Sequence, residues 1–423
     1  MRGLRKYLTP FAPDQSGAVS VLYELGGLMA ICDAGGCTGN VCGFDEPRWF
    51  ERKSALFSAG LRDMDAILGR DDRLVEKLTD AASKLDVNFV AIIGTPVPAV
   101  IGTDYHALGR MCEKKLNMPV ITIDTDGMEL YDVGEEKAWL ALFKTFAGKN
   151  AGRGEESCMQ EDSGNLSEES CISEPSGRIG ILGLTPQDIS DLYAPEKIRK
   201  YYREKGKEAI CYCMGTGTTE DSCEHLHDLE NICAAGKVEK NLVVSPAALK
   251  TAKYLEQTFG TPYEVGYPIA EELVPELDYQ GKKILIVHQQ VIGNAIRAEI
   301  RSRCQKISKT ACADENTDEN VDVHNDANIH NDVEITVASW FMIKPELSEA
   351  GDISLREEDD YMELVQKEDY DIVFADPMMK RMTEDAYKKI EIKDSQKAEK
   401  KFISATHFAV SGKLREEIKE QEA

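Results

Sequence analysis

The sequence predicts an α/β fold of three consecutive Rossmann-like domains with parallel sheets, interrupted by two disordered acidic insertions. Two observations support this prediction. Short apolar segments alternate with helical segments of about 10–15 residues, which is the pattern of parallel βαβ units. Two long segments break the pattern, because they are rich in acidic and small polar residues and carry few large apolar side chains.

The two acidic insertions cover residues 149–177 and 306–333. Neither buries enough apolar surface to offset the entropy lost on ordering, and we therefore expect both to be flexible. They leave three blocks of ordinary domain composition. We predict a first domain at 1–148, a second at 178–280 and a third at 281–423, with the second insertion inside the third domain.

The first block shows helical and strand patterns in alternation. In chain order we expect helix 17–29, strand 28–32, helix 48–61, strand 65–68, helix 73–85, strand 88–93, helix 104–116, strand 119–123 and helix 135–146. In sheets of this kind, ligands bind at the carboxyl ends of the strands, where the strand order reverses. The loops that follow the strands are therefore the first places to look for a site.

The second and third blocks repeat the alternation. In the second block we expect strand 178–182, helix 195–205, strand 208–214, helix 219–235, strand 240–245 and helix 246–259. In the third block we expect strand 283–288, helix 293–304, strand 334–339, strand 370–374 and strand 401–404.

Composition excludes several classes of protein. The net charge of −25 disfavours nucleic acid as a partner, because phosphate binding needs clustered Lys and Arg. No apolar run approaches the roughly 20 residues that span a bilayer, and no apolar segment of a signal peptide follows the basic N-terminus. We therefore expect a cytoplasmic protein with no membrane partner, whose 12 cysteines are reduced thiols or metal ligands.

The loop after the first strand is the most informative segment. Cys32, Cys37 and Cys42 recur every five residues among glycines that include Gly35 and Gly36. Glycines let the backbone come close to a bulky ligand and leave amide N–H groups free to point at sulfur. Because iron–sulfur clusters are held by Cys thiolates, these three residues are candidate metal ligands and the two glycines candidate cofactor contacts. Buried or incidental thiols are the alternative.

A second glycine pair lies between a predicted strand and helix. Gly215 and Gly217 form a Gly-x-Gly that could approach a cofactor at the helix N-terminus. The segment lacks the third glycine and the Lys of stronger phosphate-binding motifs. A simple helix cap by Thr218 or Thr219 is the alternative.

Several segments keep the order and spacing of motifs from one protein family. They are Gly35–Cys37, Asp65–Leu74, Ile92–Asp104, Pro119–Gly127, Asn241–Ser245, Leu255–Tyr263 and Asp376–Met382. On these segments the chain resembles the nitrogenase component 1 family over nearly its full length, apart from the two insertions. The resemblance implies the three-domain fold stated above. It also implies that Cys37 supplies a thiolate to an iron–sulfur cluster, such as a 4Fe-4S centre.

The chain departs from the family at the two other cluster positions. Members that hold a bridging cluster use three Cys per subunit, and here prolines stand at the other two, at about Pro13 and at Pro96. Cys32 and Cys42 could replace the missing thiolates, with Asp33, Asp14 or a partner chain completing the site. Alternatively, Cys37 from each of two related subunits could share a smaller cluster, or the cluster could be lost.

The resemblance implies an oxidoreductase subunit. It would carry electrons from an ATP-dependent iron protein through the cluster to an unknown substrate, in an oligomer with a homologous component 1-like subunit. A non-catalytic scaffold or carrier for metal-cluster or cofactor assembly is the second hypothesis. A Rossmann-type binding protein without metal is the third.

Overall fold

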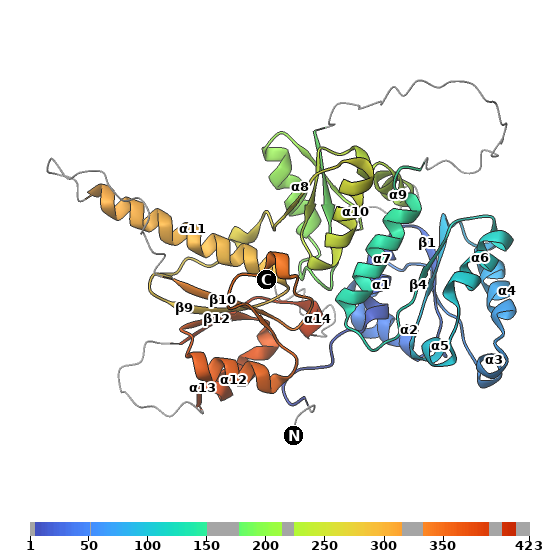
Figure 1. Cartoon of the computed structure of the whole chain (residues 1–423), viewed down its shortest axis with the longest axis horizontal. Helices are drawn as coiled ribbons and strands as arrows, with labels where there is room; N and C mark the ends of the chain where they lie inside the picture. The colour runs from blue at the N-terminus through green and yellow to red at the C-terminus, as the bar shows by residue number, and fades with distance from the viewer. Residues whose placement is uncertain are drawn as a thin grey trace.

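Three parallel sheets form the framework of the molecule. The computed structural model describes residues 5–50, 52–149, 177–213, 224–314, 333–388 and 400–411. In the described residues, every strand pairing within the named sheets is parallel. The predicted α/β class with parallel sheets is therefore confirmed. Figure 1 shows the three sheets, with helix α7 between the first and the second.

The first sheet has the strand order β2-β1-β3-β4. Its strands are β1 (Gly27–Ile31), β2 (Leu56–Ser58), β3 (Phe89–Ile93) and β4 (Val120–Ile123). The accompanying helices are α1 (Asp14–Leu22), α2 (Gly36–Asn40), α3 (Asp63–Leu68), α4 (Asp71–Ala82), α5 (Pro96–Ile101), α6 (Tyr105–Leu116) and α7 (Tyr131–Phe146). A π-helical turn at Val41–Asp45 and a 3₁₀ turn at Pro47–Phe50 follow α2. Helices α4 and α6 cover one face of this sheet, and α1 and α7 cover the other.

Two predicted elements of this block are wrong. The segment predicted as helix 48–61 forms the 3₁₀ turn and strand β2, because Leu56 and Phe57 pair with β1 in parallel register. The segment predicted as strand 65–68 lies in helix α3, where the Asp65 carboxylate accepts the backbone N–H of Arg62 and caps the first turn. In both places a tertiary contact or a cap overrides a short apolar pattern.

The second and third sheets are built in the same way. The second, in the order β6-β5-β7-β8, comprises β5 (Arg178–Leu182), β6 (Glu208–Cys211), β7 (Lys240–Val243) and β8 (Tyr263–Val265), with α8 (Ala194–Glu204), α9 (Glu224–Cys233) and α10 (Leu249–Phe259). The third, in the order β11-β10-β9-β12-β13, comprises β9 (Lys283–Val287), β10 (Glu334–Ser339), β11 (Ile353–Ser354), β12 (Ile372–Ala375) and β13 (Lys401–Ser404), with α11 (Gln290–Asp314), α12 (Glu358–Glu368), α13 (Lys380–Lys388) and α14 (Phe408–Ser411).

The predicted insertions fall mainly outside the described residues. Of the segment 149–177, the structure describes only the two end residues. The segment predicted as insertion 306–333 begins inside α11, which continues to Asp314, so its first nine residues are helical rather than irregular. Residues 315–332 lie outside the described part.

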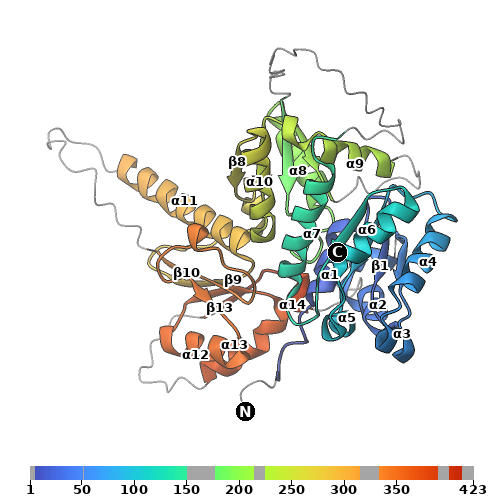
Figure 2. The same cartoon turned by 45° about the vertical axis from the view of Figure 1, so that its right-hand side comes forward.

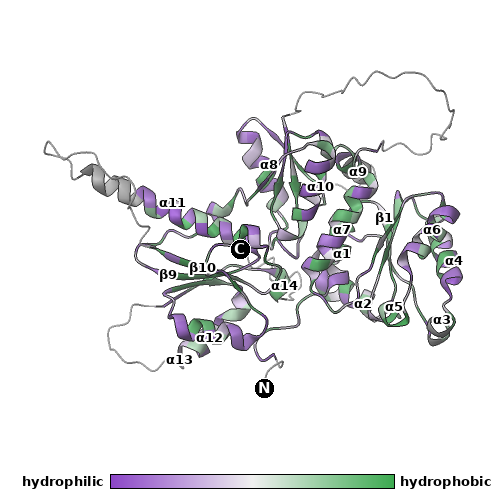
Figure 3. Cartoon of the chain, viewed as in Figure 1, coloured by the Kyte–Doolittle hydropathy of each residue, from purple (hydrophilic) through white to green (hydrophobic). Residues whose placement is uncertain are grey.

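The cores are shared between sheets rather than closed within each one. One continuous apolar cluster joins the first sheet to the second through the C-terminal half of α7, which contributes Trp139, Leu142 and Phe143. Another joins the second sheet to the third through α11, which contributes Ile292 and Ile296. Figure 2 shows α7 between the first and second sheets and α11 beside strands β9 and β10 of the third, and Figure 3 shows that the strands are largely hydrophobic.

Helices α1 and α7 touch through their backbones. A Cβ atom added at Gly134 would lie 1.7 Å from the carbonyl oxygen of Asp14, and one added at Gly17 would lie 1.9 Å from that of Tyr131. No side chain larger than hydrogen fits at either position, because the obstructing atoms belong to the opposite backbone. These two glycines therefore set the distance between α1 and α7.

We predict that Gly134→Ala destabilises the protein by roughly 2–4 kcal/mol, because the two helices must separate to admit the methyl group. Urea unfolding followed by circular dichroism measures the change. Gly266→Ala is the matched control, since its added Cβ meets nothing within 4 Å. Equal stability of the two variants would contradict the close contact.

Candidate functional site

The cysteine loop lies where the first sheet reverses its strand order. Strand β1 pairs with β2 on one side and with β3 on the other, so the loops after β1 and β3 flank the crevice at the strand ends. Cys37 sits in α2 after β1, and α5 follows β3. The sequence prediction that a strand-end loop would carry the site is consistent with this position.

Asp33 holds the loop in shape. Its carboxylate accepts the Thr38 backbone N–H at 2.8 Å, the Thr38 hydroxyl at 3.0 Å and the Ser58 hydroxyl at 2.6 Å. Gly35 has φ +114°, a conformation that favours glycine, and lets the chain turn into α2. The Asp33 carboxylate accepts three hydrogen bonds and is 2% exposed. Asp33 therefore stabilises the loop and is not a candidate metal ligand.

The structure separates Cys32 from the other two cysteines. Side chains alternate along a strand, and Cys32 continues the row of Leu28 and Ala30 into the core beneath α4 and α6. Cys37 and Cys42 pack against the opposite core, and both are partly exposed. Among the described residues, no three His, Cys, Asp or Glu side chains come together as a metal site. The three-thiolate site within one chain is therefore not assembled here.

Burial raises the pKa of all three thiols. Cys32 is affected most: its pKa rises to about 12, with the neighbouring Asp33 carboxylate adding to the effect of burial. The pKa of Cys37 is raised by partial burial and by Asp33, and that of Cys42 by partial burial and by Glu46. At Cys37 a backbone hydrogen bond lowers the thiol pKa, but burial and Asp33 outweigh it. A bound metal would therefore have to displace the protons of these thiols.

The residues at the two proline positions are structural. Pro13 caps α1, and the Asp14 carboxylate accepts the backbone N–H groups of Asp126 and Gly127 at 2.9 and 2.8 Å. Pro96 is the first residue of α5 and lies against Gly127. Asp14 is fully buried with both carboxylate oxygens bonded, and it is not available to complete a cluster.

A buried arginine below the loop was not predicted from the sequence. Arg48 is 1% exposed and pairs with Glu46 at 2.7 Å and with Glu24 at 3.1 Å. It also donates to the backbone carbonyls of Ser20 and Cys213, so it joins the cysteine loop to the second sheet. The one local signal was the Glu-Pro-Arg sequence at 46–48, which by itself is unremarkable.

Exposed apolar side chains surround the cysteine loop. They come from the elements that follow all four strands of the first sheet, together with the β2 edge, and we call them the first-sheet apolar surface. Its members are Phe44, Phe57, Met64, Leu68, Val97, Val100, Ile101 and Met128. Val100 is 85% exposed and Met128 81%, which is unusual for such side chains in a monomer. Figure 3 shows α5 as one of the hydrophobic helices at this edge of the molecule.

A second group of polar residues lies where the three sheets meet. The N-terminal half of α7 supplies Tyr131, Asp132, Glu135 and Glu136, which contact the loops after β5, β10 and β13. Tyr131 contacts Asp188 and His407, Asp132 accepts the Met342 N–H, Glu135 accepts the Thr185 hydroxyl, and Glu136 pairs with Lys250 and Lys344. We call this group the three-sheet junction.

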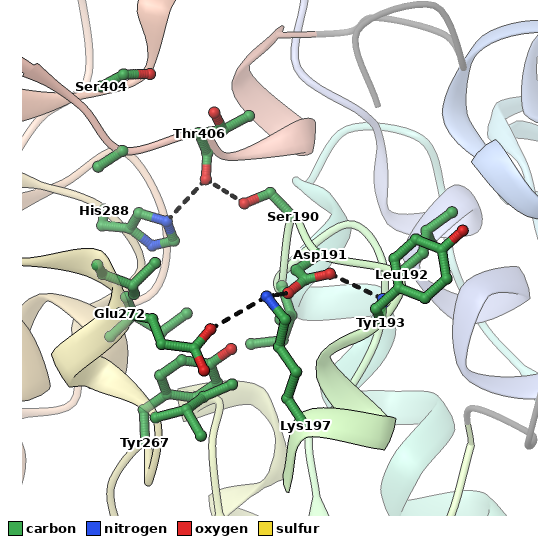
Figure 4. A pocket seen from close by; sticks show the side chains of 15 residues that line it. Ser190, Asp191, Leu192, Tyr193, Lys197, Tyr267, Glu272, His288, Ser404 and Thr406 are labelled. Carbon is green, nitrogen blue, oxygen red and sulfur yellow. Dashed lines mark hydrogen bonds and ion pairs between the residues drawn. The ribbon is translucent and has the colours of Figure 1, made fainter. Parts of the chain in front are cut away.

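A cavity of about 630 Å³ lies beside the junction, between the second and third sheets. Its wall includes His288, Ser190 and Thr406 near the junction, with Lys197 and Tyr267 farther out. Figure 4 shows Lys197 between Asp191 and Glu272, to which its Nζ lies at 2.7 and 3.1 Å. This volume is typical of sites for small organic molecules.

Comparison with known proteins gives the family. The sequence profile described as Nitrogenase component 1 type Oxidoreductase matches residues 15–270. The chain belongs to this family. The resemblance inferred from the motifs is thereby confirmed. No curated protein sequence matches the chain.

Solved structures agree on the fold of this component 1-type chain. "Nitrogenase Cp1 at pH 6.5" superposes with a TM-score of 0.60 at 12% identity, covering 99% of this chain and 90% of that chain. "Nitrogenase Cp1 at pH 5" gives a TM-score of 0.55 at 15% identity, covering 90% and 82%. At these identities the likeness shows the fold alone.

The structure describes some of the predicted cofactor-binding glycines and not others. Gly36 lies in α2 beside Cys37, and a Cβ added there would meet nothing within 4 Å, so space for a ligand exists at that backbone. Gly215 and Gly217 lie outside the described residues.

In the described part of this component 1-type chain, no helix is long and apolar enough to cross a membrane.

We predict that iodoacetamide alkylates Cys37 and Cys42 in the folded protein and spares Cys32. The reaction should accelerate as the pH rises, because the thiolate is the nucleophile and the pKa of both accessible thiols is raised. Peptide mass spectrometry measures the labelling. Cys112 is the buried control and should react only after denaturation. Labelling of Cys32 at the rate of Cys37 would contradict its placement.

The junction predicts a pH dependence of stability. Burial raises the pKa of Asp188 to about 7, so its contribution to stability is complete below about pH 4 and is lost as the pH rises to about 7. Burial lowers the pKa of His288 to about 4, which acts in the opposite direction. The comparison with Asp188→Asn isolates the carboxyl group. Relative to wild type, this variant should gain on the order of 1–4 kcal/mol between pH 4 and 7 in urea unfolding. A constant difference would contradict the raised pKa.

Proposed function

We propose that this chain is a subunit of a nitrogenase-like oxidoreductase complex in the cytoplasm. It carries electrons from an ATP-dependent iron protein, through an iron–sulfur cluster at Cys37, to a substrate in the cavity beside the three-sheet junction. The observation that supports this most is the position of Cys37. The thiol is partly exposed at the strand-end crevice of the first sheet and is surrounded by the first-sheet apolar surface.

The residues present fit half of a cluster site. Cys37 and Cys42 lie on one face of the loop, whereas iron–sulfur clusters of the common types use four ligands. The glycines between and beside them, Gly36, Gly39 and Gly43, have open space where a side chain would project. The described residues therefore fit a cluster completed by ligands from a second subunit. Such a cluster, when bound, supplies one-electron transfer.

The apolar surface supports a homologous component 1-like subunit as the partner. Large exposed side chains from α3, α5 and the π-helical turn cost free energy in water unless another protein covers them. Because they surround Cys37, the subunit that covers them would also reach the cluster. Hydrogen bonds of Arg48 and Asp33 fix the conformation of the loop. The Cys37 thiol is therefore accessible to a partner subunit without rearrangement of the loop.

The cavity limits the class of substrate. Its wall combines apolar side chains with the carboxylates of Asp191 and Glu272, which outnumber the single ammonium group of Lys197. Burial lowers the pKa of His288 to about 4, so this imidazole is neutral at physiological pH. An uncharged or cationic organic molecule with an apolar body therefore fits the wall better than a phosphate or a carboxylate.

A scaffold or carrier for cluster assembly is the second candidate. The described part of the chain lacks a complete ligand set, and an incomplete set suits transfer of a cluster to another protein as well as shared binding. The two functions differ in what happens after loading. A reductase subunit keeps the cluster through reduction, whereas a carrier releases it to an acceptor apoprotein.

We predict that anaerobic reconstitution with iron and sulfide, in the presence of the homologous subunit, loads the wild-type chain and that Cys37→Ser loses most of the bound iron. Cys32→Ser is the matched control and should retain it, because its thiol is in the separate core under α4 and α6. Iron and sulfide analysis with visible absorption measures the loading.

ATP-dependent reduction of the loaded centre by an iron protein separates the two candidates. Reduction that requires ATP supports the oxidoreductase, and transfer of the cluster to an apoprotein without reduction supports the carrier. An iron-free wild-type preparation, with or without a homologous subunit, would exclude both.

A further inference from the structure

The wall of the cavity beside the three-sheet junction contains a tyrosine hydroxyl group without a partner. Tyr267 lines the cavity, and its side chain is more than nine-tenths buried, with 8% exposed. Within the described part of the chain, its hydroxyl group makes no hydrogen bond. A buried hydroxyl group normally has a partner, either in the protein or in a molecule bound beside it. This hydroxyl group therefore indicates a ligand in the cavity.

Tyr267 lies close to two carboxylates that share one ammonium group. Lys197 Nζ lies 2.7 Å from Asp191 Oδ2 and 3.1 Å from Glu272 Oε2. Figure 4 shows the Tyr267 side chain next to that of Glu272. Burial raises the pKa of Tyr267, and the carboxylates of Asp191 and Glu272 add to this effect, so the phenol keeps its proton. We call this part of the cavity the carboxylate end. Its charged groups carry one more negative than positive charge and therefore favour a cation.

The polar side chains at the other end of the cavity, next to the junction, are already bonded. His288 Nε2 donates to the Thr406 carbonyl at 3.1 Å, and its Nδ1 accepts the backbone N–H of the next residue at 2.8 Å. The Ser190 hydroxyl also donates to the Thr406 carbonyl. The buried side chains of Ile189 and Ile292 line the cavity as well. This junction end therefore offers mainly apolar contact to a ligand.

An ion pair that only joins α8 to the 3₁₀ turn Ala270–Leu273 is the alternative role for Lys197. The Lys197 side chain is 43% exposed and that of Glu272 52%, and exposed ion pairs contribute little to stability. Such a contact accounts for the charged groups but leaves the Tyr267 hydroxyl group without a partner. Because the ion pair is weak, another cation can displace the lysine at small cost.

We propose that the cavity binds an organic cation, an inference that rests on the proposed use of this cavity as the substrate site. The ammonium group of the ligand replaces Lys197 Nζ between the carboxylates of Asp191 and Glu272, and the lysine turns to solvent. An ammonium group has three N–H donors, and the hydroxyl oxygen of Tyr267 accepts the third. The apolar body of the ligand lies against Ile292 at the junction end. The substrate class is therefore an amine with a large apolar body.

Binding of three probes with the same apolar body tests the charge preference. Naphthylethylamine, naphthylethanol and naphthylpropanoate are titrated into the isolated wild-type chain at neutral pH, and isothermal titration calorimetry measures their affinities. We expect the amine to bind roughly tenfold more tightly than the alcohol, because hydrogen bonds to a charged group are stronger than those between neutral groups. The carboxylate should bind more weakly than the alcohol. Tighter binding of the carboxylate, equal binding of the three probes or no binding of the amine overturns the proposal.

Substitutions at the carboxylate end locate the bound amine. Glu272→Gln should weaken amine binding by roughly tenfold and leave the affinity for the alcohol unchanged, and Tyr267→Phe should weaken amine binding by about threefold. Lys197→Met should tighten it by about threefold, because the competing ammonium group is removed. Lys205→Met is the matched control. It removes the same charge just beyond the far end of α8 and should bind the amine as wild type does.

Unchanged amine affinity in both Glu272→Gln and Tyr267→Phe overturns the site. Circular dichroism establishes that each variant is folded. The Glu272 side chain is about half exposed, so its variant tests the site even if Tyr267→Phe does not fold. These measurements use no iron, iron protein or ATP. Failure of the amine site and failure of the proposed electron transfer are therefore distinguishable.

Discussion

The contact between α1 and α7 fixes the geometry of both candidate sites. Because the two backbones touch at Gly17 and Gly134, rotation of α7 about its axis would drive a side chain into the α1 backbone. Residues four apart share one face of a helix. The fixed rotation therefore directs Tyr131 and Glu135 toward the second sheet, and Asp132 and Glu136 toward the loop after β10. A different rotation would leave these acidic groups buried without partners.

The molecule buries ionisable groups in two different ways. Arg48 is matched by Glu46 and Glu24, so its charge is retained and its hydrogen bonds tie the cysteine loop to the second sheet. Asp188 and Glu135 lack a cation of their own, and burial raises the pKa of each. The first arrangement joins two elements through a paired and hydrogen-bonded charge. In the second arrangement, the stability of the folded state depends on whether Asp188 and Glu135 are protonated.

Much of the fold could be predicted from the sequence, because most strands are short apolar runs with clear ends. The predicted strands 178–182, 334–339 and 401–404 have the same bounds as β5, β10 and β13. Strand β2 and helix α3 were missed, since pairing with β1 and a capping carboxylate decide their conformations. These contacts are made with residues that the local pattern does not contain.

The candidate site was less predictable than the fold. The glycine and cysteine pattern located the loop, and the two-residue period of β1 could also have shown that Cys32 belongs to the face of Leu28 and Ala30. The three-sheet junction carried no such signal. Tyr131, Asp188 and His407 are separated by 57 and more residues, and only the packing of all three sheets brings them together.

The sharing of apolar cores between sheets has a mechanical consequence. One core spans the first and second sheets, another spans the second and third, and α7 and α11 each contribute to one of them. A hinge motion that moved one sheet relative to its neighbour would break a continuous apolar core. Such motions are therefore disfavoured. The span between the Cys37 crevice and the cavity is consequently constant. For the proposed electron transfer, whose rate falls off steeply with distance, a rigid body keeps the tunnelling distance the same, and only the loops at the cavity wall are left to admit and release a small molecule.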